Sequence, residues 1–408
     1  MKRQVKRPNG IQSKKGKLYA VISFSTIVNG QRKQQKKWYA TGLTDIPANY
    51  NEAENLRNRK LIDLYSRKQI SSGQLAISDA VYHFLANKEK KIRNTTYSSY
   101  LHRGKHIADY FGNISINELK TEDAENFLNY LLTSGNNAIT HVRKGSETGL
   151  SARTVKDIRL LFSQIFDYCI DNGIVSENVV KKAKPDAELI SQKKYTNIDG
   201  TNFFDQEECK LFLTLVKDHP LYLLFVLAIR FGLRREEAIG LKWSNVDLNR
   251  KTLRVASTVT IGTRVNQQDD TKTDESFRTY PLTDDLCELF KNEWVKQTKF
   301  REFFGNTYIE NDYVFKHENG KMYYPDYPSK LIKKIIKKHP ELPQDVHFHS
   351  LRYSCVSNLI DAGFDVKKIQ AWVGHKDIET TLKIYAKIKS EKEKQKIGEQ
   401  LAKMYAGL

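Results

Sequence analysis

The longest apolar run in this chain, Leu221 to Ile229, contains nine residues. It is too short to span a bilayer, because a transmembrane helix needs about 20 such residues. Since the run has no polar face, it suits a helix that the rest of a domain covers on all sides. A chain of 408 residues is long enough for two or three domains and for a sizeable core. The sequence therefore predicts a soluble, globular protein without a membrane segment.

Helical spacing of apolar residues dominates residues 75–185. The clearest helix is expected from Ala152 to Asn172, and its apolar stripe consists of Val155, Ile158, Leu161, Phe162, Ile165 and Phe166. Thr121 to Ala124 has the residue types of a capped helix start. Lys181 to Tyr195 is basic and contains Pro185, so we expect an interdomain linker there.

Helical and β patterns alternate in the remaining part of the chain, residues 200–408. Helices are expected near 205–217, 220–231 and 235–241, and a strand over 252–259 is expected to pair with 278–282. Lys389 to Met404 predicts a charged helix, whose thin apolar stripe would pack on this chain or on a neighbouring copy; the stripe is Ile397, Leu401 and Met404. The whole chain is expected to be multidomain and mainly α-helical, with small β-sheets.

The formal net charge is +19, and the first 45 residues hold over half of it, with eleven Lys and Arg against one acid. A polyanion such as nucleic acid is the natural partner, because neutralised phosphates release their counterions. Residues 17–43 predict a β-hairpin that turns at Asn29-Gly30, and residues 51–70 a charged helix. A basic β-ribbon can enter a DNA groove, although a solvated hairpin would look similar. The residues expected to contact DNA are Lys14, Lys15, Lys17, Arg32, Lys33, Lys36 and Lys37.

The cysteines give no sign of a disulfide framework or a zinc ribbon, because they are far apart and form no Cys-x-x-Cys pair; they are Cys169, Cys209, Cys287 and Cys355. A reducing cytoplasm fits this pattern best. His347 and His349 have no cysteine or carboxylate pair nearby, so a metal site is not indicated. No phosphate-binding glycine loop, Gly-x-Ser-x-Gly or His-Glu-x-x-His is present either. We therefore expect neither a metal nor a cofactor.

A set of residues suited to phosphodiester cleavage without a metal is spread over residues 234–385. Such a reaction needs cations on the non-bridging oxygens, a nucleophile, and an acid for the departing alkoxide. Arginine suits the first task, because its forked donors stay protonated. Taken singly, each residue has a common structural explanation, and spacing leaves the choice between Arg234 and Arg235 open. The set is Arg234, Lys272, His349, Arg352, His375 and Tyr385.

In this order the residues resemble the tyrosine recombinase (phage integrase) family, strongly over about 200–390. Gly232-Leu233-Arg234-x-x-Glu237 resembles the family's first arginine box, which favours Arg234 and makes Glu237 a nearby structural acid. Lys272 is similar to the β-hairpin lysine, and His349-x-x-Arg352-Tyr353 to the second box, with both side chains on one face of a helix. The remaining matches are Val373-Gly374-His375, with valine where the family has leucine, and Thr380-Thr381-x-x-x-Tyr385.

The resemblance implies a role for each residue. Tyr385 would attack the scissile phosphate and form a 3′-phosphotyrosyl link. Arg234 and Arg352 would neutralise the non-bridging oxygens, and Lys272 would protonate the leaving oxygen. His349 would assist proton transfer, and His375 would hydrogen-bond the phosphate. Strand exchange would pass through a Holliday junction inside a homotetramer on double-stranded DNA, without a cofactor.

The organisation of the chain is most similar to three-domain integrases of phages and Gram-positive conjugative transposons. This implies an arm-type DNA-binding domain with its following helix at 1–70, a helical core-binding (SAM-like) domain at 75–185, and a mixed α/β catalytic domain with a C-terminal trans-packing helix at 200–408. It also implies core-type and arm-type attachment sites, with an excisionase and a host DNA-bending protein as accessory partners. Two alternatives remain, a type IB topoisomerase-like relaxing enzyme and a non-catalytic DNA-binding regulator on the same fold.

Overall fold

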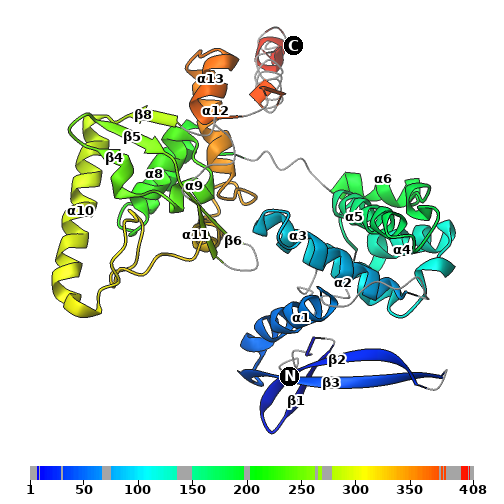
Figure 1. The fold of residues 1–408 in the computed structure, drawn as a ribbon. Coiled ribbons are helices and arrows are strands. Elements are labelled where there is room, and N and C mark those ends of the chain that lie inside the picture. The colour runs from blue at the N-terminus through cyan, green and yellow to red at the C-terminus, as the bar shows by residue number, and fades with distance from the viewer. Residues whose placement is uncertain are drawn as a thin grey trace. The chain divides into compact units, whose positions relative to one another are not determined.

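The computed structural model describes residues 7–8, 10–28, 31–66, 75–135, 149–196, 203–261, 265–268, 278–375, 378–379, 381–382, 397–402 and 404. The chain divides into two compact units, Met1–Ile198 and Asp199–Leu408, which are described separately (Figure 1). Helices predominate, and the sheets are small and antiparallel, so the predicted fold class is confirmed.

The first unit opens with a three-stranded antiparallel sheet in the order β1-β2-β3. Its strands are β1 (Ile11–Lys14), β2 (Lys17–Val28) and β3 (Gln31–Thr44). The register pairs Val28 with Gln31, so the predicted hairpin is confirmed, although its turn lies outside the described residues. Strand β1 was not predicted. Leu18 and Ile11 pack beneath α1 (Tyr50–Ser66), whose Tyr50 and Ala53 complete a small core.

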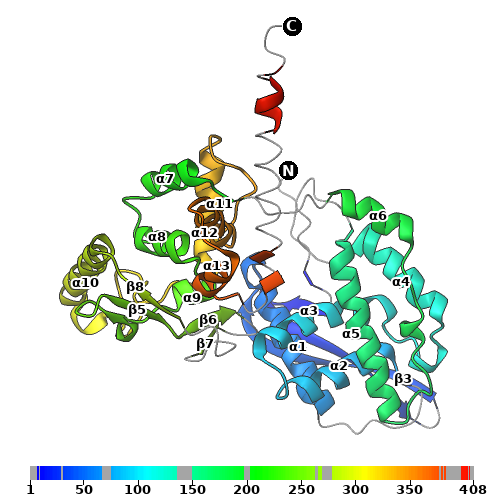
Figure 2. The ribbon, with the colours of Figure 1, turned by 90° about the horizontal axis from the view of Figure 1, so that it is seen from above.

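Five helices and two short 3-10 turns follow in the described part of this unit. They are α2 (Ile77–Lys88), α3 (Asn94–Phe111), α4 (Thr121–Ser134), α5 (Ala152–Asp171) and α6 (Ala187–Thr196), with η2 (Ile116–Glu118) and η4 (Val179–Lys181). The predicted stripe of α5 is buried throughout, and Phe162 touches Phe111 and Phe127 ring to ring. The two views show α5 running through the middle of the bundle (Figures 1 and 2).

One detail of the helical prediction was wrong. The segment predicted as a linker forms α6, whose Leu189 and Ile190 pack against the core beside α4 and α5. Pro185 precedes this helix instead of breaking it. Helix α4 begins at Thr121, so the predicted capped helix start is confirmed, and the N–H of Lys120 just before it donates to Asp123 Oδ2 at 2.9 Å. A side chain inside the first turn therefore supplies the cap.

The second unit begins with the three helices that the sequence predicted, α7 (Gln206–Leu215), α8 (Tyr222–Phe231) and α9 (Arg235–Ile239). Its strands are β4 (Val246–Asp247), β5 (Thr252–Val255), β6 (Thr258–Ile261), β7 (Val265–Gln268) and β8 (Arg278–Pro281), with η5 (Trp243–Asn245) ahead of them. Later come α10 (Asp284–Phe304), η7 (Gly305–Thr307), α11 (Tyr327–Lys338), α12 (Ser350–Asp361) and α13 (Val366–Val373).

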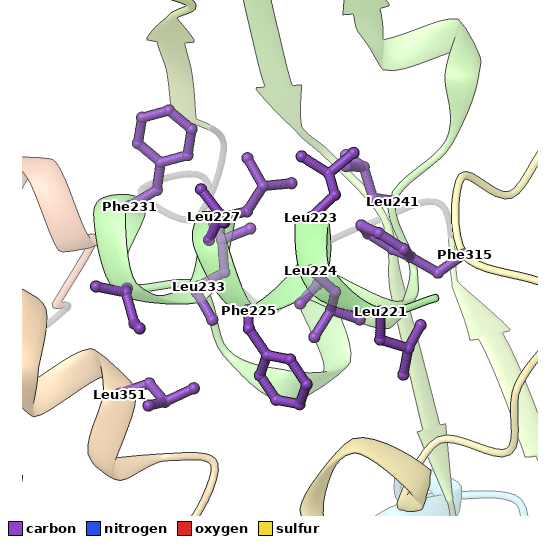
Figure 3. Packing of buried hydrophobic residues seen from close by; sticks show 14 of the residues in the cluster. Leu221, Leu223, Leu224, Phe225, Leu227, Phe231, Leu233, Leu241, Phe315 and Leu351 are labelled. Atoms are coloured by element: carbon purple, nitrogen blue, oxygen red, sulfur yellow. The ribbon is translucent and has the colours of Figure 1, made fainter. Parts of the chain in front are cut away.

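Helix α8 lies at the centre of this unit, as its all-round apolar sequence predicted. Leu224 and Leu227 are fully buried, and residues from distant segments, such as Phe315 and Leu351, close over the helix (Figure 3). Burying one such side chain contributes roughly 1.5–3 kcal/mol. The core therefore fixes the end of α8, and with it the turn that follows.

The strand predicted over 252–259 is two strands. Strand β5 pairs with β8, as predicted, with Leu253 opposite Tyr280. After Val255 the chain leaves this sheet, because the buried Ser257 hydroxyl donates to the carbonyl oxygen of Gly240 at 2.6 Å. Strand β6 then pairs with β7 in a separate ribbon beside α9.

The four cysteines are free and buried. Within the described ranges, no helix is both long enough and apolar enough to cross a membrane. Of the predicted C-terminal helix, 397–402 and 404 are described; they are helical, and Ile397, Leu401 and Met404 are exposed. The rest of Lys389–Met404 lies outside the described residues.

Candidate active site

Arg234 lies in the turn between α8 and α9. Gly232 ends α8 with φ +60°, a left-handed conformation that glycine adopts without strain. The Arg234 N–H donates to Glu237 Oε2 at 2.9 Å, and its Nη1 donates to Glu237 Oε1 at 2.7 Å. Arg235 pairs with Glu236 instead. The two bonds to Glu237 hold Arg234 in place, and its side chain is still accessible because it is 34% exposed.

Arg352, on α12, is fully buried. Its Nη1 donates to the carbonyl oxygen of Gly232 at 2.6 Å, and its Nε donates to His375 Nε2 at 3.0 Å. Burial, followed by repulsion from Arg234, lowers the pKa of Arg352 to about 9. The guanidinium therefore remains charged at neutral pH, in a fixed orientation.

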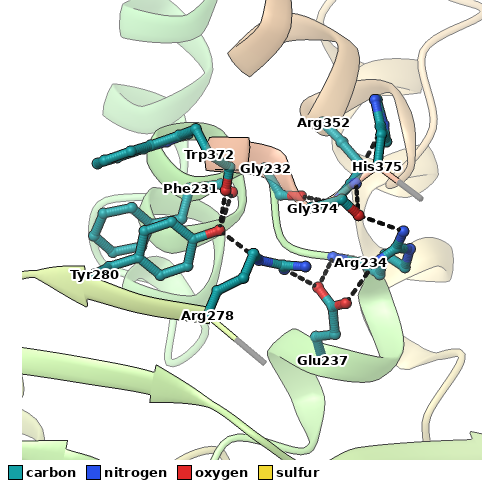
Figure 4. Close-up of polar contacts among 10 residues, drawn as sticks. All are labelled: Phe231, Gly232, Arg234, Glu237, Arg278, Tyr280, Arg352, Trp372, Gly374 and His375. Carbon is teal, nitrogen blue, oxygen red and sulfur yellow. Dashed lines mark hydrogen bonds and ion pairs between the residues drawn. The ribbon is translucent and has the colours of Figure 1, made fainter. Parts of the chain in front are cut away.

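Both arginines also donate to one carbonyl oxygen, that of Gly374. The distance is 2.9 Å from Arg234 Nη2 and 3.2 Å from Arg352 Nη2 (Figure 4). Gly374 ends α13 in the left-handed region, with φ +67°. Two guanidiniums from separate segments thus converge on a single oxygen atom. A phosphate oxygen near this position would lie within reach of both.

His375 follows this turn and is buried. Its Nε2 accepts from Arg352, so the proton lies on Nδ1, which donates to Thr381 Oγ1 at 2.8 Å. Burial, followed by the charge of Arg352, lowers the pKa of His375 to about 3, and the ring is neutral. Both ring nitrogens are engaged within the protein in this geometry. Thr381 belongs to a recognised motif, but sequence reasoning gave it no role.

Glu237 and Arg278 complete the charge cluster. Arg278 Nη2 donates to Glu237 Oε2 at 2.7 Å, and both side chains are buried. Burial alone would raise the pKa of Glu237, but the charges of Arg278 and Arg234 outweigh it, and the pKa is lowered. The sequence named Glu237 as a structural acid and Arg278 only as part of a strand. Arg278 and Tyr280 lie two positions apart on β8 and share its buried face. A charged residue at an inward-facing position of a strand was the signal in the sequence that could have identified Arg278.

Tyr280 ties β8 to the end of α13. Its hydroxyl accepts from Arg278 Nε at 2.8 Å and contacts the carbonyl oxygen of Trp372. Its ring stacks on Phe231, with the centroids 4.4 Å apart. Since Phe231 ends α8, the strand, α8 and the turn at Gly374 are joined through one side chain (Figure 4).

His349 immediately precedes α12 and is exposed. The N–H of Arg352 donates to its carbonyl oxygen at 3.1 Å, so the two residues share the first turn of α12, but His349 is exposed and Arg352 is fully buried. The imidazole lies edge to face against Tyr353, with the ring centroids 5.2 Å apart. Desolvation by the surrounding protein, then the charge of Arg352, lowers the pKa of His349.

Lys272 and Tyr385, the predicted acid and nucleophile, lie outside the described residues. Of the other four predicted residues, Arg234, Arg352 and His375 are joined by hydrogen bonds to one another or to Gly374, and His349 is near enough for the charges of Arg352 and Arg234 to act on its pKa. In the other unit, the N-terminal lysines with described side chains are all exposed; they are Lys14, Lys15, Lys17, Lys36 and Lys37. Arg32 and Lys33 lie on β3, and their side chains are outside the described part.

Two sequence families cover most of this architecture. The model of the Phage integrase family matches residues 202–392, and that of the Phage integrase N-terminal SAM-like domain matches residues 76–132. Together they span more than half of the chain. The chain belongs to the phage integrase family.

Relatives of this phage integrase carry recombinase and integrase names. A tyrosine recombinase XerC-like protein of Caldanaerobacter subterraneus subsp. tengcongensis is 28% identical, over 59% of this chain and 64% of its own length. The ICEBs1 integrase of Bacillus subtilis is 26% identical, over 71% of this chain and 73% of its own. The phage integrase described here thus spans slightly less than two thirds of the first relative.

The fold of this phage integrase is also that of a solved structure, the Tn1549 transposon integrase in complex with a circular intermediate DNA. The TM-score is 0.60 at 16% identity, and the match covers 79% of this chain and 99% of the other. At this identity, the likeness shows the fold.

Proposed function

We propose that this phage integrase is a site-specific DNA recombinase that integrates and excises a mobile element. It cuts and rejoins DNA by transesterification, through a 3′-phosphotyrosine at Tyr385 and a Holliday junction. The observation that carries the proposal is the convergence of Arg234 and Arg352 on the Gly374 carbonyl oxygen. Two forked donors aimed at one oxygen suit a scissile phosphate.

The electrostatics of the cluster support phosphate binding. Arg234, Arg278 and Arg352 carry three positive charges, and Glu237 carries one negative charge, while His375 is neutral. The cluster therefore has a net charge of +2 beside the accessible Arg234 side chain. Negative charge that develops on the non-bridging oxygens would be stabilised by donors already in place.

The chemistry follows from the proposed roles. The Tyr385 hydroxyl attacks phosphorus, the bond to the 5′ oxygen breaks, and Lys272 protonates that oxygen. The phosphodiester energy is kept in the phosphotyrosyl link, so rejoining needs neither ATP nor a metal. His349 takes up or returns the tyrosine proton. His375 orients Arg352 through its Nε2, and reaches the phosphate when one of its two present contacts is exchanged.

DNA binding is proposed to involve every part of the chain. The exposed lysines of residues 1–70 bind arm-type sites, and the helical domain of residues 75–185 binds core-type sites. In the catalytic domain, residues 200–408, helix α11 buries Ile332 and Ile336 and exposes a row of lysines suited to a DNA backbone, namely Lys330, Lys333, Lys334, Lys337 and Lys338. Four copies assemble on DNA in the cytoplasm, with an excisionase and a host DNA-bending protein as accessory factors.

A nicked suicide substrate that carries the core site tests the proposal, because loss of the short cleaved strand traps the covalent adduct. Wild-type protein should form an adduct that survives denaturing gel electrophoresis, and Tyr385→Phe should form none. Tyr324→Phe, which removes the hydroxyl of an exposed tyrosine on the same unit, is the matched control and should react normally. An adduct with Tyr385→Phe would show that the nucleophile is another residue.

The same assay separates the two alternatives. A non-catalytic regulator would bind the core site and form no adduct. A relaxing enzyme of the type IB topoisomerase kind would relax a supercoiled plasmid that lacks any attachment site, as a monomer. The recombinase should need the site and should join two duplexes.

A further inference from the structure

Glu237 lies between two arginines that face different surroundings. Its Oε1 pairs with Arg234, whose side chain is 34% exposed, and its Oε2 pairs with Arg278, whose side chain is 6% exposed. A buried carboxylate needs compensating charge, because desolvation strongly disfavours the charged form. Arg234 alone could supply that charge. It would then be largely neutralised by Glu237 and less able to attract a phosphate.

Arg278 is placed to supply the positive charge that compensates the Glu237 carboxylate. Its Nε and Nη2 are both used inside the protein, on Tyr280 and Glu237. The chain passes directly over the guanidinium, since a Cβ atom at Gly374 would lie 2.1 Å from Arg278 Nη1. The glycine thus leaves room for an arginine beneath the carbonyl oxygen that Arg234 and Arg352 share.

We infer that Arg278 is a positioning residue whose positive charge balances the negative charge of Glu237. Glu237 can then orient Arg234 without cancelling the positive charge that Arg234 presents to the scissile phosphate. Resting on the proposed function, the inference concerns how that site keeps its net charge. With Arg278 present, the charges of Arg234 and Arg352 remain for the phosphate. Without it, Glu237 cancels one of them, and the charge opposite the transition state is halved.

A charge-restoring double variant separates this role from simple support. Arg278→Gln removes the balancing charge, and Glu237→Gln removes the charge that it balances. The double variant returns the net charge to +2, and the glutamine at position 237 still offers an oxygen to Arg234. If Arg278 acted only by supporting the local structure, adding Glu237→Gln would not restore the rate that Arg278→Gln loses.

The rate of adduct formation should be measured on the suicide substrate at saturating protein, with the DNA dissociation constant measured separately. Arg278→Gln should react about 100-fold more slowly and bind DNA within about threefold of wild type, because charge stabilisation acts mainly in the transition state. The double variant should regain about tenfold of the lost rate. Arg278→Lys keeps the charge but not the fork, and should fall between wild type and Arg278→Gln. The matched control is Arg250→Gln, which removes an 86% exposed arginine from the same unit and should react normally.

Three outcomes would overturn the inference. One is normal cleavage by Arg278→Gln, and another is a double variant no faster than Arg278→Gln. The third outcome applies if Arg278→Gln does not fold. The double variant, which buries no unbalanced carboxylate, is then compared with Glu237→Gln, and a double variant that reacts more than about tenfold more slowly than Glu237→Gln would overturn the inference. A wild-type protein that forms no adduct would instead overturn the proposed function, and this inference with it.

Discussion

The N-terminal sheet and the cluster around Gly374 are both cationic, but they carry their charges differently. On the sheet, Lys14, Lys15, Lys36 and Lys37 are exposed, whereas in the cluster Arg352 and Arg278 are buried. An exposed ammonium is a hydrated point charge on a flexible stem, and a buried guanidinium is a fork of donors with fixed directions. The first arrangement attracts a polyanion, and the second holds one phosphate in one geometry. A sequence total of +19 does not distinguish the two.

Salt should separate the two regions experimentally. Exposed charges are screened beyond about 8–10 Å at physiological ionic strength, and buried ones are screened much less. Binding through the sheet should therefore weaken steeply as salt rises. The cleavage rate of DNA that is already bound should change little.

The largest expected effect comes from the buried region. Arg352→Ala or Arg234→Ala should slow adduct formation at least about 1,000-fold, since each removes donors aimed at the developing charge. The core-site dissociation constant should stay within about threefold, because many other contacts hold the duplex. Arg235→Ala is the control, as Arg235 pairs with Glu236 and is not part of the convergence. If the alanine variants cleave normally, these arginines do not bind the phosphate.

A smaller effect is expected from the sheet. Replacing Lys14, Lys15, Lys36 and Lys37 by glutamine should weaken arm-site binding about 10- to 100-fold, and should reduce the slope of log affinity against log salt by about 3. Core-site cleavage should be unchanged. Fluorescence anisotropy over a salt series measures both quantities. An unchanged slope would mean that these lysines do not contact phosphates.

The smallest effect concerns His375, whose folded pKa of about 3 lies below its unfolded value of 6.5. Between pH 3 and pH 6.5 the unfolded chain binds a proton at His375 that the folded chain does not bind. The contribution of His375 to the free energy of unfolding is therefore fully present above pH 6.5 and is lost as the pH falls toward 3. Between pH 7 and 5.5, wild type should lose about 1 kcal/mol of unfolding free energy more than His375→Gln. Urea denaturation at both pH values measures this difference.

The sequence predicted best where one physical effect dominates. Helices α5 and α8 were foreseen because their apolar spacing leaves only one way to bury them. It failed where a single tertiary contact decides, as at Ser257, whose bond to Gly240 ends strand β5. The same holds for α6, since a basic stretch after Pro185 becomes helical by packing Leu189 and Ile190 on a core that lies elsewhere in the chain.

The candidate site shows the same limit. Motif order singled out Arg234 and Arg352, because each stands in a recognisable local pattern. It did not single out Arg278, whose importance comes from Glu237, 41 positions earlier in the chain. Nor did it show that His375 would be engaged by Arg352 and Thr381 together. Partners of this kind depend on which buried surfaces meet, and no local pattern records that.

The carbonyl oxygen of Gly374 has a consequence for selectivity. Because it already accepts from both arginines, a free phosphate ion gains only the difference between one acceptor and another when it competes for them. We expect inorganic phosphate to compete poorly at cellular concentrations. A DNA phosphate has an advantage, since the rest of the duplex raises its local concentration at the cluster. The Gly374 carbonyl oxygen would then be displaced from the two arginines only by a phosphate that bound DNA already holds beside them.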